Sequence, residues 1–198
     1  MDLGIRGRTA LVAGSGAGIG RAVAESLAAE GAHVGLCART KETIGRAAAE
    51  IAAKHGVKTF GLACDLAEPT APATFVNLAR QALGPATILV TNAGGPPAGT
   101  FETLDDAAWE RAYRITLMSA VRLIREALPA MREARWGRIV NIASISVRQP
   151  IDGLLLSNSL RAAVAGMAKT LSRASRRSSA SNPSRSPPRP ASGWEPSV

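Results

Sequence analysis

The feature that most constrains this chain is the glycine-rich run LVAGSGAGIG at residues 11–20, which ends an apolar, strand-like stretch and opens an amphipathic helical pattern. Glycines at this spacing allow a tight turn, a close approach of the backbone to a pyrophosphate, and close packing of the next helix on the strand. The N-terminus of that helix adds free N–H groups and a positive dipole end. The run therefore predicts a dinucleotide site formed by Gly14, Ser15, Gly18, Ile19 and Gly20. A purely structural turn is the alternative, because strand-to-helix turns use glycine in any case.

The second informative residue is Arg39, which follows the apolar strand expected at 32–38. In a doubly wound sheet this position faces the adenosine ribose. An acidic residue there pairs with a free 2′-hydroxyl, whereas a guanidinium suits a 2′-phosphate through bidentate contacts. Arg39 therefore predicts NADP(H) as the cofactor in preference to NAD(H). The alternative is a solvated arginine at the start of the next helix, 40–55.

Composition favours one folded domain without a disulfide framework, because 46% of the 198 residues are hydrophobic and only two are cysteines. The chain shows neither a signal-peptide pattern nor an apolar run of about 18 residues, so we expect a cytoplasmic protein without a membrane partner. Cys37 and Cys64 fall in strands predicted to be buried, which indicates core thiols. No metal-ligand spacing occurs, and no metal site is predicted.

Strand and helix patterns alternate along the chain. Strands are expected near 8–13, 32–38, 57–63, 86–91 and 137–143, and helices near 19–30, 40–55, 70–82, 104–134 and 155–171. This alternation predicts an α/β fold with a Rossmann-type, doubly wound parallel sheet in three α/β/α layers. The strands at 86–91 and 137–143 are apolar along most of their length, as expected where helices cover both faces of a sheet.

Three further motifs follow the glycine run in order, namely CDL at 64–66, TNAGG at 91–95 and IVNIAS at 139–144. With these motifs, residues 1–171 resemble the short-chain dehydrogenase/reductase family, most closely its 3-oxoacyl-[acyl-carrier-protein] reductase-like members. The resemblance implies that Asp65 and Leu66 lie near the adenine and that Asn92, Ala93 and Gly94 form the floor of the cofactor site. It also implies an NADP(H)-dependent oxidoreductase that reduces a small-molecule, 3-oxoacyl-like carbonyl or oxidises the matching alcohol. A strand-ending turn without ligand contacts is the alternative for 92–97.

The catalytic positions depart from the family pattern, which typically combines Asn, Ser, Tyr and Lys, with the tyrosine as general acid/base. By the resemblance these positions fall on Thr116, Ser144, Ser157 and Arg161, so that only the serine is unchanged. A serine hydroxyl is a much weaker acid than a tyrosine, and arginine does not release its proton. We expect Ser144 to polarise a carbonyl and Arg161 to orient cofactor or substrate. The competing interpretation is a non-catalytic or degenerate dinucleotide-binding protein, a truncated member of the family.

The pattern changes after residue 171, where a Ser-, Arg- and Pro-rich stretch begins. We predict a dinucleotide-binding domain at 1–171 and a tail at 172–198 that is disordered from about residue 175. The family's last helix continues into two further strands, which we expect to be absent, and we hypothesise a frameshifted or truncated gene product. Polyanion binding by the basic tail is a third interpretation, although no nucleic-acid partner is expected. The resemblance also implies a homo-oligomer interface on helices 104–134 and 155–171.

Overall fold

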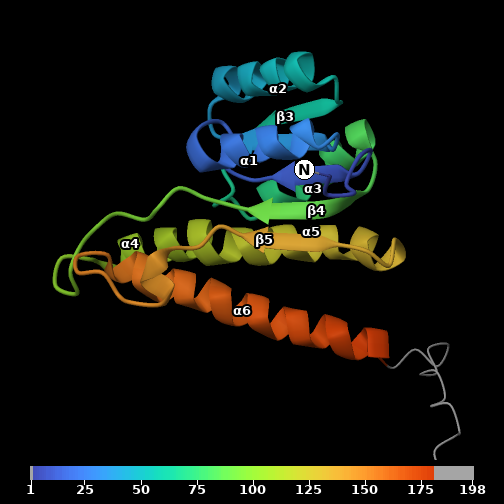
Figure 1. The fold of residues 1–198 in the computed structure, drawn as a ribbon. Helices are drawn as coiled ribbons and strands as arrows, with labels where there is room; N and C mark the ends of the chain where they lie inside the picture. Colours follow the sequence, from blue (N-terminus) through green and yellow to red (C-terminus); the bar gives the residue numbers. More distant parts are fainter. Residues whose placement is uncertain (1, 181–198) are drawn as a thin grey trace, which may run out of the picture. The chain divides into compact units, whose positions relative to one another are not determined.

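The computed structural model describes residues 2–180, and its parallel sheet has the strand order β3-β2-β1-β4-β5 (Figure 1). The strands are β1 (Thr9–Val12), β2 (His33–Ala38), β3 (Thr59–Ala63), β4 (Ala86–Thr91) and β5 (Arg138–Asn141). Every neighbouring pair is parallel. The order reverses at β1, because β2 and β3 lie on one side of it and β4 and β5 on the other. Such a switch point leaves a crevice at the carboxyl ends of the strands.

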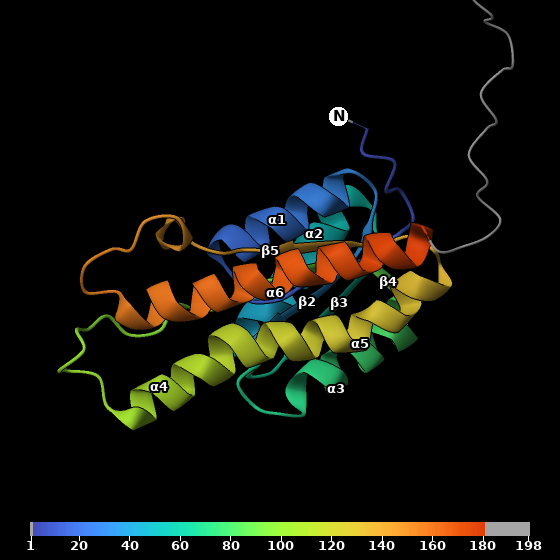
Figure 2. The ribbon, with the colours of Figure 1, turned by 90° about the horizontal axis from the view of Figure 1, so that it is seen from below.

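Helices cover both faces of the sheet. The α-helices of the described residues are α1 (Gly18–Ala29), α2 (Lys41–His55), α3 (Ala71–Leu83), α4 (Asp106–Ala112), α5 (Ser119–Glu133) and α6 (Leu155–Ala180), and α1, α2, α3 and α5 pack on the strands. Figure 2 shows α1 and α2 on one face and α3 and α5 on the other. A core of aliphatic side chains fills the space between the sheet and the first pair of helices, and includes Val12, Val34, Leu36, Ile44 and Ile51. This arrangement confirms the predicted Rossmann-type α/β fold.

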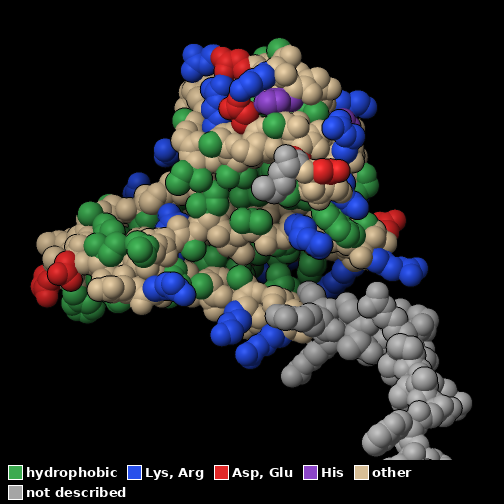
Figure 3. All heavy atoms as spheres, in the orientation of Figure 1, with side chains coloured by type: hydrophobic (Ala, Val, Ile, Leu, Met, Phe, Trp, Pro, Cys, Tyr) green, Lys and Arg blue, Asp and Glu red, His purple; other side chains and the backbone are tan. Residues whose placement is uncertain are grey.

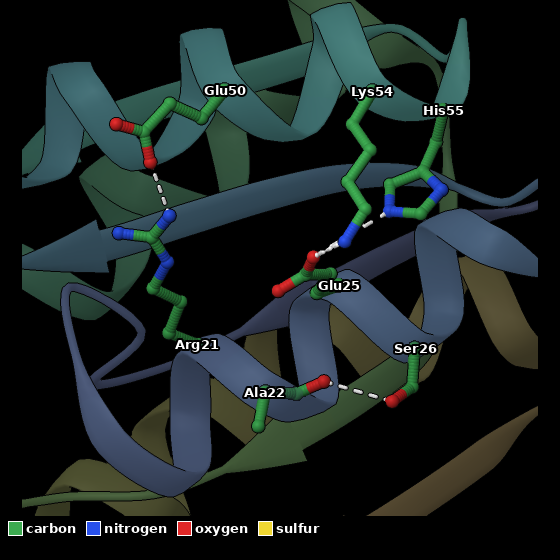
Figure 4. Close-up of polar contacts among 7 residues, drawn as sticks. All are labelled: Arg21, Ala22, Glu25, Ser26, Glu50, Lys54 and His55. Carbon is green, nitrogen blue, oxygen red and sulfur yellow. Dashed lines mark hydrogen bonds and ion pairs between the residues drawn. The ribbon is translucent and has the colours of Figure 1, made fainter.

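Ion pairs join α1 to α2 on their outer surface (Figure 4). Arg21 pairs with Glu50, and Lys54 pairs with Glu25. His55 Nε2 lies 3.9 Å from the same Glu25 carboxylate. The hydrogen bond and the charge of Lys54 lower the pKa of Glu25 below its ordinary value. These pairs hold the two helices in register on the side of the sheet that carries the glycine-rich run.

The helix predicted at 104–134 is three consecutive elements. α4 is followed by a π-helical turn, η1 (Tyr113–Met118), and then by α5. A π turn accommodates an extra residue in a helix and often marks a functional site. Here it carries Thr116, whose side chain is buried. Hydrophobic periodicity spans all three elements, so it gives no sign of the insertion.

The last helix, α6, runs to Ala180, nine residues beyond the predicted end at Leu171. The sequence contains neither Gly nor Pro between Gly166 and Pro183, and its Ala and Arg residues favour a helix. Residues 172–180 of the predicted tail are therefore helical, and 181–198 lie outside the described residues. The chain divides into units at 1–165 and 166–198, and the described part of the second is the C-terminal portion of α6.

The strand β5 departs from the expectation that helices cover both of its faces. Arg138 is exposed, and Val140 exposes 52% of its surface. Within residues 2–180, β5 pairs with β4 alone and forms an edge of the sheet. No helix in that range combines the length and the apolarity needed to cross a membrane.

Candidate functional site

The glycine-rich loop between β1 and α1 packs backbone against backbone. Gly14 has φ +57°, and Asn92 Nδ2 donates a hydrogen bond of 3.0 Å to its carbonyl oxygen. A Cβ at Gly20 would lie 2.3 Å from that same oxygen. The loop and the first turn of α1 are thus fixed against the end of β4, in a conformation that only glycine allows.

The N-terminus of α1 faces outward from this loop. Its N-cap residue, Ala17, makes no side-chain capping bond, and the first turn carries no acidic residue. Ile19 in that turn is 66% exposed. The first N–H groups of α1 are therefore available to an anionic ligand, as the sequence predicts for a phosphate site.

Ser15 points into the protein interior and does not line the cleft beside the loop. It is completely buried, its hydroxyl donates to the carbonyl oxygen of Val12 at 2.8 Å, and it accepts from the N–H of Cys37 at 3.1 Å. These bonds tie the glycine loop to the end of β2. The Ser15 hydroxyl therefore shapes the loop from inside the protein.

A cleft of about 490 Å³ opens beside the loop, at the carboxyl ends of the strands. Seven of the predicted cofactor residues line it, namely Gly14, Arg39, Asp65, Leu66, Asn92, Ala93 and Gly94. Four others, Ser15, Gly18, Ile19 and Gly20, are not among its lining residues. The structure thus gathers motifs from β1, β2, β3 and β4 around one concave surface.

Charge in the cleft is concentrated in a few side chains. Arg39 is exposed at the end of β2, and no carboxylate among residues 2–180 pairs with it. Asp65 accepts a hydrogen bond of 3.0 Å from the N–H of Ala67, which shapes the turn after β3. An unpaired guanidinium beside a glycine-rich helix N-terminus suits a ligand with more than one phosphate.

Several lining residues were not predicted from the sequence, among them Arg111, Ile115, Cys37 and Cys64. Arg111 and Ile115 are four residues apart in the α4–η1 segment, and this spacing places them on one helical face. Cys64 follows β3 and is partly exposed, whereas Cys37 is buried. A hydrogen bond with Cys37 lowers the pKa of Cys64, while the same bond and burial raise the pKa of Cys37.

Two of the four predicted catalytic positions line one cavity. Thr116 and Arg161 line a second, small cavity of about 20 Å³, together with residues at the ends of β4 and β5. The hydroxyl oxygen of Thr116 is buried there without a hydrogen-bond partner. Arg161 Nη1 donates to the carbonyl oxygens of Ile142 at 2.9 Å and Ala143 at 3.3 Å. Burial lowers the pKa of Arg161.

Ser144 and Ser157 lie outside the lining of these two cavities. The Ser144 hydroxyl accepts a hydrogen bond of 3.1 Å from the N–H of Ser146 and caps a short 3-10 helix, η2 (Ile145–Val147). Ser157 lies in the first turn of α6. Within the described part of the chain, no group of three His, Cys, Asp or Glu residues is placed to hold a metal ion.

Two loops extend beyond the carboxyl edge of the sheet, after β4 and after β5. A parallel bridge between Gly99 and Leu154 joins them. They carry the exposed side chains of Phe101, Ile145 and Ile151, which are 77%, 75% and 40% exposed. Figure 3 shows hydrophobic side chains gathered at this end of the molecule, near α4. The loops therefore present an apolar surface close to the cleft.

Comparisons with known proteins agree with this geometry. A family model described as short chain dehydrogenase matches residues 8–179. An uncharacterized oxidoreductase of Bacillus subtilis is 35% identical over 155 residues, which cover 78% of this chain and 58% of that protein. The 3-oxoacyl-[acyl-carrier-protein] reductase of Aquifex aeolicus is 33% identical over 174 residues, which cover 87% of this chain and 70% of the relative.

A solved structure is similar over most of the described fold. The L-sorbose reductase of Gluconobacter frateurii, crystallised with NADPH and L-sorbose, superposes with a TM-score of 0.86 at 37% identity. The match covers 89% of this chain and 67% of the reductase. The chain thus spans about three fifths to two thirds of the length of several proteins that it resembles.

Proposed function

The chain belongs to the short-chain dehydrogenase family, and from this premise we propose that it binds NADP(H) and acts as an oxidoreductase on a carbonyl compound or the matching alcohol. One observation carries the proposal: Arg39 lines the cleft at the end of β2 without a carboxylate partner among residues 2–180. A guanidinium at this point suits a 2′-phosphate. The NADPH in the similar L-sorbose reductase supports the same choice.

The residues of the cleft fit this cofactor. At Gly14 and Gly20 a Cβ would meet Asn92 or the carbonyl oxygen of Gly14, so these glycines allow the close packing that fixes the loop beside the cleft. The uncapped N-terminus of α1 would hold the pyrophosphate, and Arg39 would hold the 2′-phosphate. Leu66, which is buried, would support the adenine from the end of β3.

When bound, NADPH supplies a hydride for carbonyl reduction. The chain's own contribution is to bind, orient and polarise. Ser144 lies after β5 with its hydroxyl oxygen close to the backbone N–H of Ser146, so its proton is free to reach a substrate oxygen. Arg161 holds the segment after β5 through two carbonyl oxygens and acts as a positioning residue. Because Ser157 is a weak acid, water or a group on the substrate must supply the proton.

The apolar loops after β4 and β5 support a substrate with an apolar chain next to its carbonyl, such as a 3-oxoacyl compound. Phe101 and Ile145 are among the most exposed hydrophobic side chains of the fold. The name of the similar Aquifex reductase is in keeping with this class. We therefore choose short 3-oxoacyl esters and diketones as test substrates.

The second candidate is a protein that binds the dinucleotide without turnover. It is favoured by the hydrogen bonds of Arg161, whose Nη1 donates to the carbonyl oxygens of Ile142 and Ala143. Arginine keeps its proton, so the Ser157–Arg161 pair offers no evident proton relay. Cofactor binding is common to both candidates, and only turnover separates them.

The test is calorimetric titration with NADPH and NADH of the full chain, Arg39→Ala and Arg46→Ala. Arg46 is exposed on α2 and does not line the cleft, so it serves as the matched control. We expect Arg39→Ala to weaken NADPH binding about tenfold, because one charge-assisted contact at an exposed site is lost. The same substitution should leave NADH binding unchanged. Loss of NADPH absorbance with the substrate panel then identifies the reductase, and binding without that loss identifies the non-catalytic protein. Equal affinity of the wild-type chain for the two cofactors would contradict the NADP(H) assignment.

A further inference from the structure

The wall of the cleft formed by α4 and η1 contains a second arginine, which the function proposed above does not use. Arg111 lies one helical turn before Ile115, and both line the cleft. Arg111 is exposed, and among residues 2–180 no carboxylate pairs with it. Its neighbour Arg114, by contrast, is paired with Glu110 at 2.7 Å.

The surroundings of Arg111 differ from those of Arg39. The lining residues nearest to it in the chain are Ala112, which is 1% exposed, and Ile115, which is partly buried. Pro96 and Pro97 of the loop after β4 and Leu66 after β3 add further apolar surface to the same cleft. Arg39 comes from a different element, at the end of β2. The cleft therefore has one cationic group at the ribose position and another on an apolar wall.

A planar guanidinium on an apolar wall suits the face of an aromatic ring better than an isolated phosphate. Arginine stacks on π-systems, and its flat fork leaves the face free for this contact. Lysine lacks that plane and acts as a point charge. The adenine base is the aromatic group of a dinucleotide that would meet the residues after β3 and β4.

We propose that Arg111 is a cofactor-binding residue that covers the adenine base. This inference rests on the cofactor site proposed above and assigns different roles in it to Arg39 and Arg111. Arg111 contributes equally to NADPH and NADH, because both carry the base, whereas Arg39 contributes to NADPH alone. Selectivity for the 2′-phosphate then belongs to Arg39, and general affinity for adenine nucleotides belongs to Arg111.

The experiment is titration of the full-length chain and its variants with NADPH, NADH and ADP-ribose, which lacks the nicotinamide. Arg111→Ala should weaken all three by a common factor of about 5- to 30-fold, the effect of a partly desolvated cation–π contact. Arg111→Lys should recover less than half of that loss, because it restores charge without the plane. Arg114→Ala, which removes the neighbouring arginine outside the cleft, is the control and should leave all three affinities unchanged.

Three results overturn the inference. A loss confined to NADPH would assign Arg111 to the 2′-phosphate, and full rescue by Arg111→Lys would show that charge alone acts. Unchanged affinities in Arg111→Ala, together with normal binding by the wild-type chain, would remove Arg111 from the site and leave the proposed function intact. Failure of the wild-type chain to bind any of the three ligands would overturn the cofactor site itself.

Discussion

The close contact between α1 and the glycine loop predicts that one added methyl group, in Gly20→Ala, destabilises the fold. A Cβ at Gly20 would lie 2.3 Å from the carbonyl oxygen of Gly14 and 2.8 Å from Asn92 Nδ2, whereas ordinary contacts begin at 3.4 Å. Both neighbours are fixed, because Asn92 Nδ2 itself donates to that oxygen. In Gly20→Ala the helix and the loop must therefore move apart by about 1 Å, which is the difference between the 2.3 Å separation and an ordinary contact of 3.4 Å.

The size of the effect follows from two opposing contributions. Overpacking costs about 3 kcal/mol where backbone must shift, and replacing a helical glycine by alanine returns about 1 kcal/mol. Gly20→Ala should therefore lower the free energy of unfolding by about 2 kcal/mol. Gly45 in α2 is the matched control, because a Cβ there has no atom within 4 Å. Gly45→Ala should raise the free energy of unfolding by about 0.5–1 kcal/mol.

The assay is urea and thermal unfolding of both variants beside the wild type, followed by NADPH titration. A total difference of about 3 kcal/mol corresponds to roughly 6–12 °C between their melting temperatures for a chain of this size. Gly20→Ala should also weaken NADPH binding, while Gly45→Ala should leave it unchanged. Equal stability of the two variants would refute the view that a rigid backbone contact shapes the cradle.

Three further predictions concern other parts of the fold. Arg161→Ala should lower the free energy of unfolding by about 1.5–3 kcal/mol in urea, because it loses hydrogen bonds from a charged group to carbonyl oxygens after β5; an unchanged midpoint would contradict those bonds. The depressed pKa of Glu25 means that its pair with Lys54 stabilises the fold above its ordinary pKa of 4.5 and that this stability is lost as pH falls through the lower folded value. The melting temperatures of Glu25→Gln and wild type should therefore differ at pH 7 and approach each other as the pH falls below the lowered pKa; a constant gap would exclude the linkage. Cys64, with its lowered pKa and its place in the cleft, should react with iodoacetamide faster than buried Cys37 and be protected by NADPH; equal labelling rates by mass spectrometry would contradict this.

The sequence predicts the strands of the sheet well because each is an apolar run followed by a turn. The strand expected at 86–91 is β4 (Ala86–Thr91), and that expected at 32–38 is β2 (His33–Ala38). Motifs at the ends of these strands also converge, as expected when parallel strands share one carboxyl edge. Gly14, Arg39 and Asn92 accordingly line a single cleft.

Features that depend on tertiary contacts could not be read in the same way. The π turn at 113–118 keeps the apolar pattern of the predicted helix, so the position of Thr116 becomes clear only when the backbone is seen. Ser15 belongs to the glycine run, but its hydroxyl turns inward because it bridges Val12 and Cys37. Arg111 lies between apolar helical positions and gives no local signal that it faces the cleft of β1–β4.

The end of α6 shows the limit of composition as a guide. A stretch rich in Ser and Arg is typical of disordered segments, yet Ala and Arg also sustain a helix that has already begun. The helix accordingly continues past Leu171 to Ala180. The helical propensity of Ala and Arg, together with the absence of a helix-breaking Gly or Pro between Gly166 and Pro183, outweighs the disorder that the overall composition suggests.

The central claim is that the cleft at the carboxyl edge of the sheet is an NADP(H) site with Arg39 at the 2′-phosphate. A crystal structure of the full chain with NADP⁺ tests it most directly. We expect the 2′-phosphate within hydrogen-bonding distance of the Arg39 guanidinium and the pyrophosphate at the N-terminus of α1, beside Gly14. A nucleotide bound elsewhere, or bound in the cleft with its 2′-phosphate away from Arg39, would contradict the claim.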